Sequence, residues 1–228
     1  MTDFFRFPRT PHLAWLGSGE PRDDKLLSPE EVTALLTGSV VVEEKLDGAN
    51  LGISVGADGR LRAQNRGQYL HQPYSGQFAR LTDWMAAHET GLRDALGPDL
   101  IAFGEWCAAL HSLDYSALPG WWVLFDVYDR AVARFWSTAR RDQWAKGLGL
   151  PTVPILFRGP THLAVLKELL RREQSRYRAG PMEGLVVRLE HGDWLQARAK
   201  LVCPEFTQSI DAHWRQRSLQ WNRLGISA

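Results

Sequence analysis

The sequence predicts an α+β fold in which antiparallel β-sheets are flanked by helices. A β-branched apolar run at 40–42 ends in two carboxylates and a lysine at 43–45, residues 51–55 alternate, and an Asp58-Gly59 turn signal leads into a returning strand at 60–65. Apolar residues recur at helical spacing between the later strands. Because the chain has 228 residues, it can bury one substantial core, and we expect a single domain over residues 1–228.

Composition restricts the compartment and the partners of the protein. The net charge is +1, so a nucleic-acid partner requires a local basic patch. Cys107 and Cys203 have no C-x-x-C partner, which disfavours a zinc site or a disulfide framework and fits a reducing cytosol. No apolar stretch approaches the ~20 residues of a membrane span, and a signal-peptide pattern is missing. We therefore expect a cytoplasmic protein with no membrane partner.

The first part of the chain predicts an arm followed by a helix. Residues 1–27 are rich in aromatic residues and proline, including Phe7, and should pack their rings on the domain, since a linker would be polar. Ser28 then opens a capping box with proline at the first helical position. This pattern predicts a short helix that runs to about Leu36 and is ended by Gly38.

The middle of the chain alternates helical and strand patterns. Residues 75–96 carry apolar side chains at helical spacing, and we expect two helices that are broken near Gly91. The apolar runs at 100–107 and 121–128 predict two buried strands. If the second strand is regular, Phe125 and its neighbour Asp126 point to opposite faces, and at most one of them faces a ligand.

The last part of the chain predicts two helices, a hairpin and a closing helix. A helix should begin at Ser137, and a longer amphipathic helix should cover 161–176, whose outward basic run is either solvated surface or a polynucleotide contact. Residues 182–188 and 194–202 predict a β-hairpin. Apolar residues over about 204–224 predict a closing helix, and its members are Phe206, Ile210, Trp214, Trp221 and Leu224. This segment is too short for an appended OB barrel.

Lys45 is the candidate nucleophile of the chain. It ends the run V-V-V-E-E-K and opens the turn K-L-D-G-A-N, so the strand should deliver the lysine from a buried sheet to its edge. Gly48 lets the backbone turn sharply beside a phosphate-sized ligand. We hypothesise that Lys45 is a covalent nucleophile, although a strand that ends in a charged turn also occurs in sheets without such a function.

Other charged residues sit at strand ends, where they can face the same pocket. Glu105 ends an apolar strand, and a carboxylate there is costly unless it is paired, binds a metal or faces a cleft. Glu183 directly precedes a strand and can hold a divalent ion. Arg198 and Lys200 share one strand face. The alternative for Glu105 is an ordinary surface position.

Together these motifs resemble the ATP-dependent RNA ligases of the covalent nucleotidyltransferase superfamily, which also contains DNA ligases and capping enzymes. The resemblance covers about residues 11–200. Its motifs are Lys45-x-Asp47-Gly48-x-Asn50, Gly104-Glu105-Trp106, Asp126-Val127-Tyr128-Asp129, Glu183-Gly184 with its aliphatic strand, and Arg198-Ala199-Lys200. It implies a ligase-type nucleotidyltransferase (ATP-grasp-like) fold. Family members usually carry Lys-x-Lys where this chain has Arg198, which keeps the charge and changes the geometry.

The resemblance also implies roles for individual residues. Lys45, Lys200 and Arg198 are the implied catalytic residues. The implied nucleotide-binding residues are Glu44, Asp47, Asn50, Arg66, Glu105, Phe125, Glu183 and Lys200. Glu105 and Glu183 are the implied ligands of Mg²⁺ or Mn²⁺. Phe125 would stack on the purine, although a core position is nearly as plausible for a phenylalanine on a buried strand.

The implied reaction begins with ATP, since nothing before Lys45 resembles the extra domain of NAD⁺-dependent ligases. Lys45 takes up AMP, with Lys200 or a bound metal favouring its neutral amine. In the implied scheme, AMP then passes to a 5′-phosphate end of RNA, or of DNA as the alternative, and that end is sealed to a 3′-hydroxyl. The implied role is RNA repair, beside an end-healing kinase or phosphatase partner. The alternatives are a DNA ligase, a capping-type nucleotidyltransferase or a non-ligating end-binding subunit.

Overall fold

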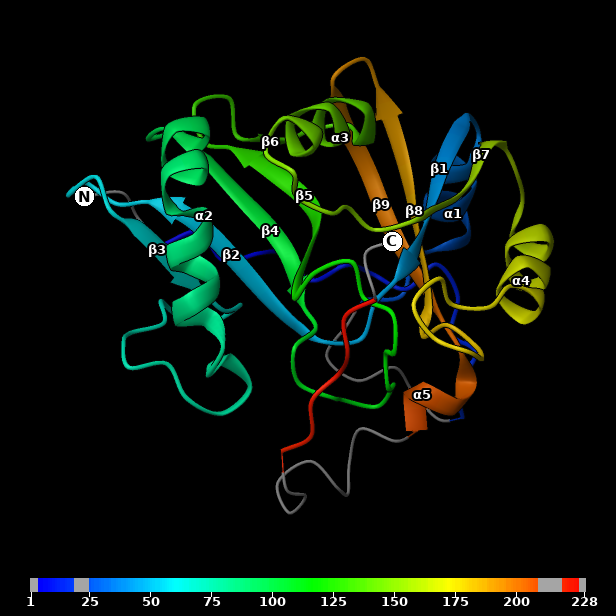
Figure 1. Cartoon of the computed structure of the whole chain (residues 1–228). Helices are drawn as coiled ribbons and strands as arrows, with labels where there is room; N and C mark the ends of the chain where they lie inside the picture. Colours follow the sequence, from blue (N-terminus) through cyan, green and yellow to red (C-terminus); the bar gives the residue numbers. More distant parts are fainter. Residues whose placement is uncertain (1–3, 19–24, 209–218, 226–228) are drawn as a thin grey trace.

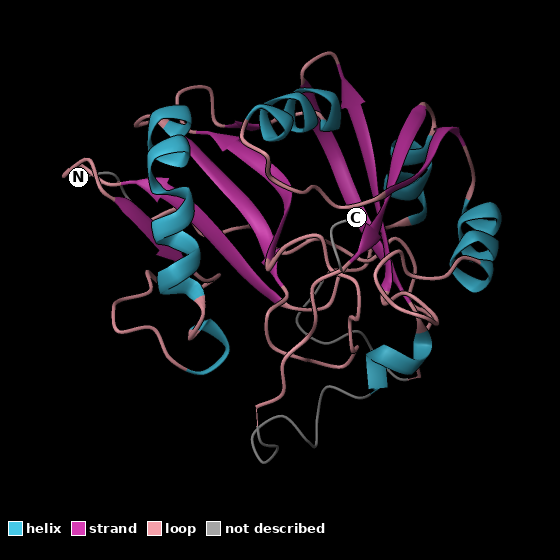
Figure 2. Cartoon of the chain, in the orientation of Figure 1, coloured by secondary structure: helices cyan, strands magenta, loops and turns pink. Residues whose placement is uncertain are grey.

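The structure, a computed structural model, describes residues 4–18, 25–208 and 219–225. Two antiparallel sheets form its centre, in agreement with the predicted fold class (Figures 1 and 2). The four-stranded sheet has the order β7-β1-β8-β9, with strands Ile155–Pro160, Ser39–Lys45, Gly184–His191 and Trp194–Val202. The five-stranded sheet has the order β3-β2-β4-β5-β6, with strands Leu61–Gln64, Ala49–Val55, Leu100–Trp106, Trp122–Asp129 and Arg134–Phe135.

Pairing between distant segments places the end of β1 beside the start of β8. These strands run antiparallel, and Lys45 lies opposite Gly184. β8 also pairs with β9, which confirms the predicted hairpin. In the other sheet, β2 pairs with β3 as predicted and with β4 on its other side, where Asn50 lies opposite Glu105. The two sheets therefore bring the last residues of β1 and β4 and the first residues of β8 to one region.

Helices cover the outer faces of the sheets. Helix α1, Pro29–Leu36, has the predicted capping box, in which the N–H of Glu31 donates to Ser28 Oγ (3.2 Å). It packs with α4, Leu163–Arg172, on the four-stranded sheet through one apolar cluster. Helix α4 is shorter than the helix predicted over 161–176. None of the helices in the described part of the chain has the length and apolar character needed to cross a bilayer.

Helix α2, Leu81–Leu96, covers the five-stranded sheet and corrects the prediction of two helices (Figure 1). It runs unbroken through Gly91, and only a short 3₁₀ turn, Gly76–Phe78, precedes it. A glycine inside a helix costs about 1 kcal/mol relative to alanine, which tertiary packing readily outweighs. Here the helix buries Trp84 and Leu92 on the sheet, and Gly91 lies on its exposed side.

The helix predicted at Ser137 is present as α3, Thr138–Gly147, and Ser137 caps it. The predicted arm packs as expected in its described part, since Phe5 stacks on Tyr128 with ring centroids 3.8 Å apart. Phe7 is buried, and residues 1–3 and 19–24 of the predicted arm lie outside the described residues.

The closing helix predicted over 204–224 is wrong in its last part. Helix α5 covers Pro204–Gln208. Residues 219–225 are not helical, because Trp221 and Leu224 instead form β-bridges with residues of the loop after β4. The predicted members Ile210 and Trp214 lie outside the described residues.

We predict that Gly91→Ala raises the free energy of unfolding by about 0.5–1 kcal/mol. The added methyl group would meet its nearest neighbour, Leu148 Cδ2, at 3.6 Å, which is an ordinary contact. Urea denaturation at equilibrium measures the change. The matched control is Ala87→Gly at another exposed position of α2, and it should lower the unfolding free energy by a similar amount. A loss of stability in Gly91→Ala would contradict the assignment of Gly91 to an unstrained helix interior.

Candidate active site

The chain crosses from one sheet to the other immediately after Lys45. Lys45 is the last residue of β1 and Ala49 is the first of β2, so only three residues make the crossing. Gly48 is required in this short connection, because a Cβ atom there would lie 2.6 Å from the carbonyl oxygen of Trp106. Gly48 thus allows close approach to the backbone of strand β4, while its predicted place beside a phosphate-sized ligand stays a prediction.

A cleft of about 1000 Å³ lies between the two sheets at this crossing. All the predicted site residues line it, namely Glu44, Lys45, Asp47, Asn50, Arg66, Glu105, Phe125, Glu183, Arg198 and Lys200. Their convergence from six separate segments agrees with a shared site, while the individual roles stay predictions. The contacts of each side chain show what it can do there.

Lys45 is paired with an acid inside the cleft. Its Nζ atom lies 2.5 Å from Glu183 Oε2, and its side chain is 25% exposed. Burial by itself lowers the pKa of Lys45, but the charges of Glu183 and Glu105 outweigh this, and the pKa is raised. We expected a nearby cation such as Lys200 to favour the neutral amine of Lys45. In the protein alone the surrounding carboxylates instead favour the ammonium form of Lys45.

Glu105 and Glu183 form an acidic pair beside Lys45. Burial raises the pKa of Glu105 to about 8 and that of Glu183 to about 7, with the charge of Lys45 opposing both shifts. Because burial disfavours the charged form of these two carboxylates, a divalent cation beside them would stabilise that form, and hard divalent cations prefer oxygen ligands. The described residues contain no group of three or more His, Cys, Asp or Glu side chains able to hold a metal ion. A cation here would therefore need further oxygen ligands from water or substrate.

Asp47 is held by the loop that follows β4. Its Oδ2 atom accepts hydrogen bonds from the backbone N–H groups of Ser112 (2.6 Å) and Leu113 (2.9 Å). Its own backbone N–H donates to the hydroxyl of Tyr115 (2.8 Å). Asp47 thus fixes the turn after Lys45. Nearby, Asn50 Oδ1 is buried and has no hydrogen-bond partner among the described residues, which leaves an acceptor for a ligand.

Glu44 has a different position from its neighbours on β1. Side chains alternate along a strand, so Glu44 lies on the opposite face from Glu43 and Lys45. Its Oε2 atom accepts a hydrogen bond from the backbone N–H of Arg176 (3.0 Å). Burial raises its pKa, and hydrogen bonds from Ser175 and Arg176 oppose this. Although Glu44 lines the cleft, one of its carboxylate oxygens is already used to hold a loop.

Phe125 and Asp126 both line the cleft, which corrects the prediction that at most one of them does. The prediction assumed a regular strand. In the structure the register of β5 against β4 shifts, with Asp126 opposite Phe103 and Leu124 opposite Gly104. Phe125 is the extra, bulged residue, and a bulge breaks the alternation of side chains. The ring of Phe125 is half-buried and lies edge-on to Phe7 at 5.3 Å.

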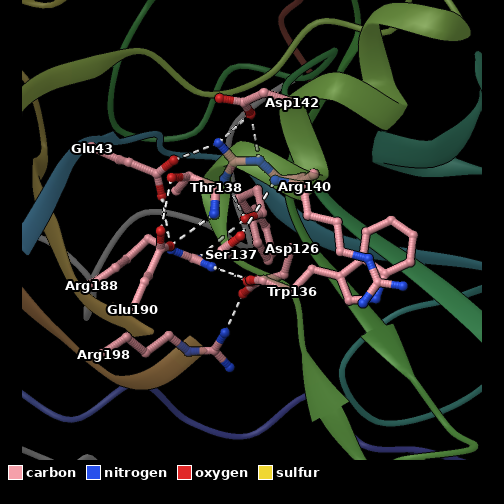
Figure 3. A network of polar contacts seen from close by, with 12 residues as sticks. Glu43, Asp126, Trp136, Ser137, Thr138, Arg140, Asp142, Arg188, Glu190 and Arg198 are labelled. Atoms are coloured by element: carbon pink, nitrogen blue, oxygen red, sulfur yellow. Dashed lines mark hydrogen bonds and ion pairs between the residues drawn. The ribbon is translucent and has the colours of Figure 1, made fainter. Parts of the chain in front are cut away.

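A buried ionic network lies beside the cleft (Figure 3), and its members Glu43, Asp126 and Arg188 line the cleft. Arg188 Nη1 donates a hydrogen bond to Asp126 Oδ1 at 2.8 Å, and Arg141 Nη2 forms an ion pair with Glu43 Oε1 at 2.6 Å. Arg188 Nε also bonds Glu190 at 2.9 Å. These side chains come from both sheets and from α3, so the network ties the sheets together. Sequence reasoning missed it, and the available signal was a charge inside the apolar runs V-V-V-E and V-V-R-L.

Arg198 belongs to this network as well as to the cleft. Its guanidinium pairs with Asp126 and lies 4.4 Å from the ring centroids of Phe7 and Phe135. Burial lowers the pKa of Arg198, and the charge of Asp126 opposes this. The planar guanidinium suits stacking between rings, and an ammonium would fit less well. The charge of Arg198 is thus offset by Asp126 rather than directed at an open phosphate position.

Lys200 is positioned by the N-terminal arm. Its backbone N–H donates to the carbonyl of Pro11 (2.8 Å), and its carbonyl accepts from the N–H of Leu13 (2.7 Å). The arm thereby adds to the edge of β9. It also supplies wall residues that sequence reasoning did not assign to the site, including Trp15, whose indole N–H is buried without a hydrogen-bond partner in the described part of the chain.

Arg66 lines the cleft, whereas the basic run of α4 lies outside it. Arg66 is exposed and follows β3 at the edge of the cleft. Arg171 and Arg172 do not line the cleft, and both pair with Glu168 on the exposed side of α4. Of the two interpretations of this run, its partial neutralisation favours a solvated surface.

We predict that Asp126→Ala lowers the free energy of unfolding by about 3–5 kcal/mol, because it leaves Arg188 and Arg198 buried without their shared carboxylate. Urea denaturation measures the loss. The matched control is Glu168→Ala, which also removes one carboxylate from two arginines, but at an exposed position on α4. This control should change stability far less, since water solvates the released charges. Equal losses in both variants would refute a special role for burial.

The family model described as RNA ligase matches residues 38–202. Comparison with curated protein sequences gives no significant match. Among solved structures, an archaeal ATP-dependent RNA ligase is similar with a TM-score of 0.61 and 22% identity, over 86% of this chain and 47% of that one.

Structures of Naegleria gruberi RNA ligase are similar too. A mutant of that enzyme with ATP and Mn has a TM-score of 0.63 and 18% identity, over 90% of this chain and 58% of that one. The same enzyme with PPi has a TM-score of 0.58 and 22% identity, over 87% of this chain and 61% of that one. The chain thus spans between about half and three fifths of the length of these structures.

Proposed function

This chain belongs to the RNA ligase family, and on that premise we propose that it is an ATP-dependent RNA ligase that works through a lysyl-AMP intermediate on Lys45. The observation that carries the proposal is the position of Lys45. It ends β1 inside a cleft of about 1000 Å³ that Lys200 also lines, beside the partly buried carboxylates of Glu105 and Glu183. The similar archaeal enzyme is described as ATP-dependent, and a Naegleria structure contains ATP and Mn.

The proposed first step is transfer of AMP from ATP to the lysine. The Nζ lone pair of Lys45 attacks the α-phosphorus, a P–N bond forms, and the bond to the β-phosphate oxygen breaks to release pyrophosphate. The lysine must lose its ammonium proton before or during attack. Lys200 lies on the same cleft wall, where its charge can stabilise the transferring phosphate. Phe125 would offer its half-buried ring to the purine, and Asn50 and Arg66 would contact the nucleotide.

Glu105 and Glu183 would hold Mg²⁺ or Mn²⁺ in this proposal. They offer carboxylate oxygens, and such cations commonly use one or two carboxylates and complete their coordination with water and substrate phosphates. Held by these two residues, a cation would offset the carboxylate charge that raises the pKa of Lys45 and would so favour the neutral amine. Asp47 and Glu44 would support the site through the loops they hold.

The later steps follow from the chemistry of the activated phosphate. AMP passes from Lys45 to a 5′-phosphate end, and a 3′-hydroxyl attacks that end, forms the phosphodiester and releases AMP. We propose RNA ends as substrates, with DNA ends as the alternative, and work in cytoplasmic RNA repair beside an end-healing kinase or phosphatase. We also propose that residues 1–228 act as one adenylyltransferase domain.

We predict that incubation with α-³²P-labelled ATP and Mg²⁺ or Mn²⁺ labels the wild-type protein covalently and does not label Lys45→Ala. A denaturing gel shows the label, and acid should release it because a phosphoramidate bond is acid-labile. Folding of the variant is checked by its unfolding curve. The proposal would be refuted if a folded wild-type protein that carries no AMP beforehand took up no label. That result would favour a non-ligating end-binding subunit.

Donor and substrate panels separate the related activities. Labelling by GTP rather than ATP would indicate a capping-type enzyme. Sealing of DNA nicks but not of RNA ends by the labelled protein would indicate a DNA ligase. The proposed function requires ATP labelling followed by sealing of ends that contain RNA.

We predict that EDTA abolishes labelling and that Glu183→Gln raises the Mn²⁺ concentration for half-maximal labelling by about tenfold or more, since one carboxylate ligand is lost. A titration of initial labelling rate against Mn²⁺ measures this. The matched control is Glu168→Gln on the exposed side of α4, which should leave the midpoint unchanged. An unchanged midpoint in Glu183→Gln would exclude Glu183 as a ligand.

A further inference from the structure

The end of the described chain docks on the loop that follows β4. We call residues 219–225 the C-terminal strap and residues 107–118 the docking loop. The two segments lie side by side (Figure 1). The N–H of Leu110 donates to the carbonyl of Gln220 (2.8 Å), and the N–H of Gly225 donates to the carbonyl of Leu118 (2.8 Å). Backbone hydrogen bonds therefore join the strap to the loop near both of its ends.

Asn222 lies at the centre of this contact. It is 4% exposed, and within the described residues its side chain forms hydrogen bonds to backbone groups of the docking loop. Nδ2 donates to the carbonyls of Cys107 (2.8 Å) and Ala109 (3.1 Å), while Oδ1 accepts from the N–H of Tyr115 (2.8 Å). One side chain thus satisfies backbone groups from both halves of the loop and holds them at a set separation.

The opposite side of the same loop holds the turn that follows the proposed nucleophile. Ser112 and Leu113 donate their N–H groups to the Asp47 carboxylate, and the Tyr115 hydroxyl accepts from the Asp47 N–H. Leu46 packs in an apolar cluster with Leu113 and Tyr115. The docking loop therefore lies between Asn222 on one side and the Leu46-Asp47 turn on the other.

Trp221 provides a second anchor of the strap. Its ring lies 4.5 Å from the guanidinium carbon of Arg80, and the ring of Trp121 lies 4.7 Å from that carbon. Arg80 immediately precedes α2, so the strap is tied to the five-stranded sheet and its helix as well as to the loop. Such stacked cation–π contacts hold a chain end against its support. No residue of the strap lines the cleft.

We infer that the C-terminal strap positions the catalytic turn, with Asn222 as a positioning residue that acts on Lys45 and Asp47 through the docking loop. Without the Asn222 side chain, two carbonyls and one N–H of the loop lose their partners in a buried place, and the loop must shift to satisfy them. That shift loosens the bonds of the loop to Asp47. The kinetic part of this inference rests on the proposed function, and the structural part does not.

Hydrogen exchange tests the structural part on the full chain without nucleotide. In Asn222→Ala, we expect the Ser112 and Leu113 amides to exchange about tenfold faster than in wild type or more, because Asp47 no longer holds them firmly. The amides of α2 should be unchanged. The matched control is Arg223→Ala, whose exposed side chain lies on the same strap, and it should leave all these amides unchanged. If Asn222→Ala does not fold, Asn222→Asp replaces it, since this variant keeps the acceptor for Tyr115 and loses the two donated bonds.

Labelling kinetics test the link to Lys45. Asn222→Ala should lower the rate of Lys45 adenylylation at saturating ATP by about tenfold and leave the KM for ATP unchanged, since the strap does not line the cleft. Tyr115→Phe removes the hydroxyl that contacts Asp47 and leaves the bonds of Asn222 intact, so it should cause a similar loss. The double variant should lose no more than either single one, because both changes interrupt the same connection.

The outcomes separate the inference from the proposed function. Unchanged hydrogen exchange at the Ser112 and Leu113 amides in Asn222→Ala would overturn the inference. If the amides of α2 exchanged faster by the same factor as these two, the variant would be destabilised as a whole, and the inference would also be overturned. Full additivity of Asn222→Ala and Tyr115→Phe would also overturn it. Lack of labelling in the wild type would instead refute the proposed function, and the exchange of the two amides would still decide whether the strap positions the turn.

Discussion

The cleft depends on a buried ionic network that joins the two sheets. Arg188 of β8 reaches Asp126 of β5, and Arg141 of α3 reaches Glu43 of β1. Charged side chains are costly to bury unless they are paired and hydrogen-bonded. Because the Arg188–Asp126 pair joins β8 of one sheet to β5 of the other, these two charges are satisfied only when both sheets hold their relative positions. The distance between the cleft walls is thus tied to the pairing of these charges.

The chemistry at Lys45 follows from the same balance of burial and charge. Glu105 and Glu183 are held in the cleft by strands β4 and the start of β8, where burial raises the pKa of both acids. Their remaining charge keeps the lysine protonated at rest. The protein alone therefore holds Lys45 in an ion pair, and the proposed attack would require a change in the charge around its amine.

Support for the site comes from both ends of the described chain. The arm pairs with β9 beside Lys200, and the strap pairs with the loop that holds Asp47. Neither segment has strong secondary-structure propensity of its own. Each acquires its place by supplying hydrogen bonds that an edge strand or a loop backbone would otherwise leave unsatisfied. The arm also stacks Phe7 on Arg198, which directs that cation to Asp126.

By itself, the sequence determined the described strands other than β6 and β7, the capped helix α1 and the identity of the residues around Lys45, because local propensity, turn signals and a short spaced motif act within a few residues of chain. Only the tertiary structure decided that α2 continues through Gly91 and that residues 219–225 follow a non-helical path. It also decided the β-bulge that lets the side chains of Phe125 and Asp126 both line the cleft. It also decided the network of Glu43, Arg141 and Arg188. These features depend on contacts between distant segments, whose burial free energy outweighs local preference and leaves no local pattern to read.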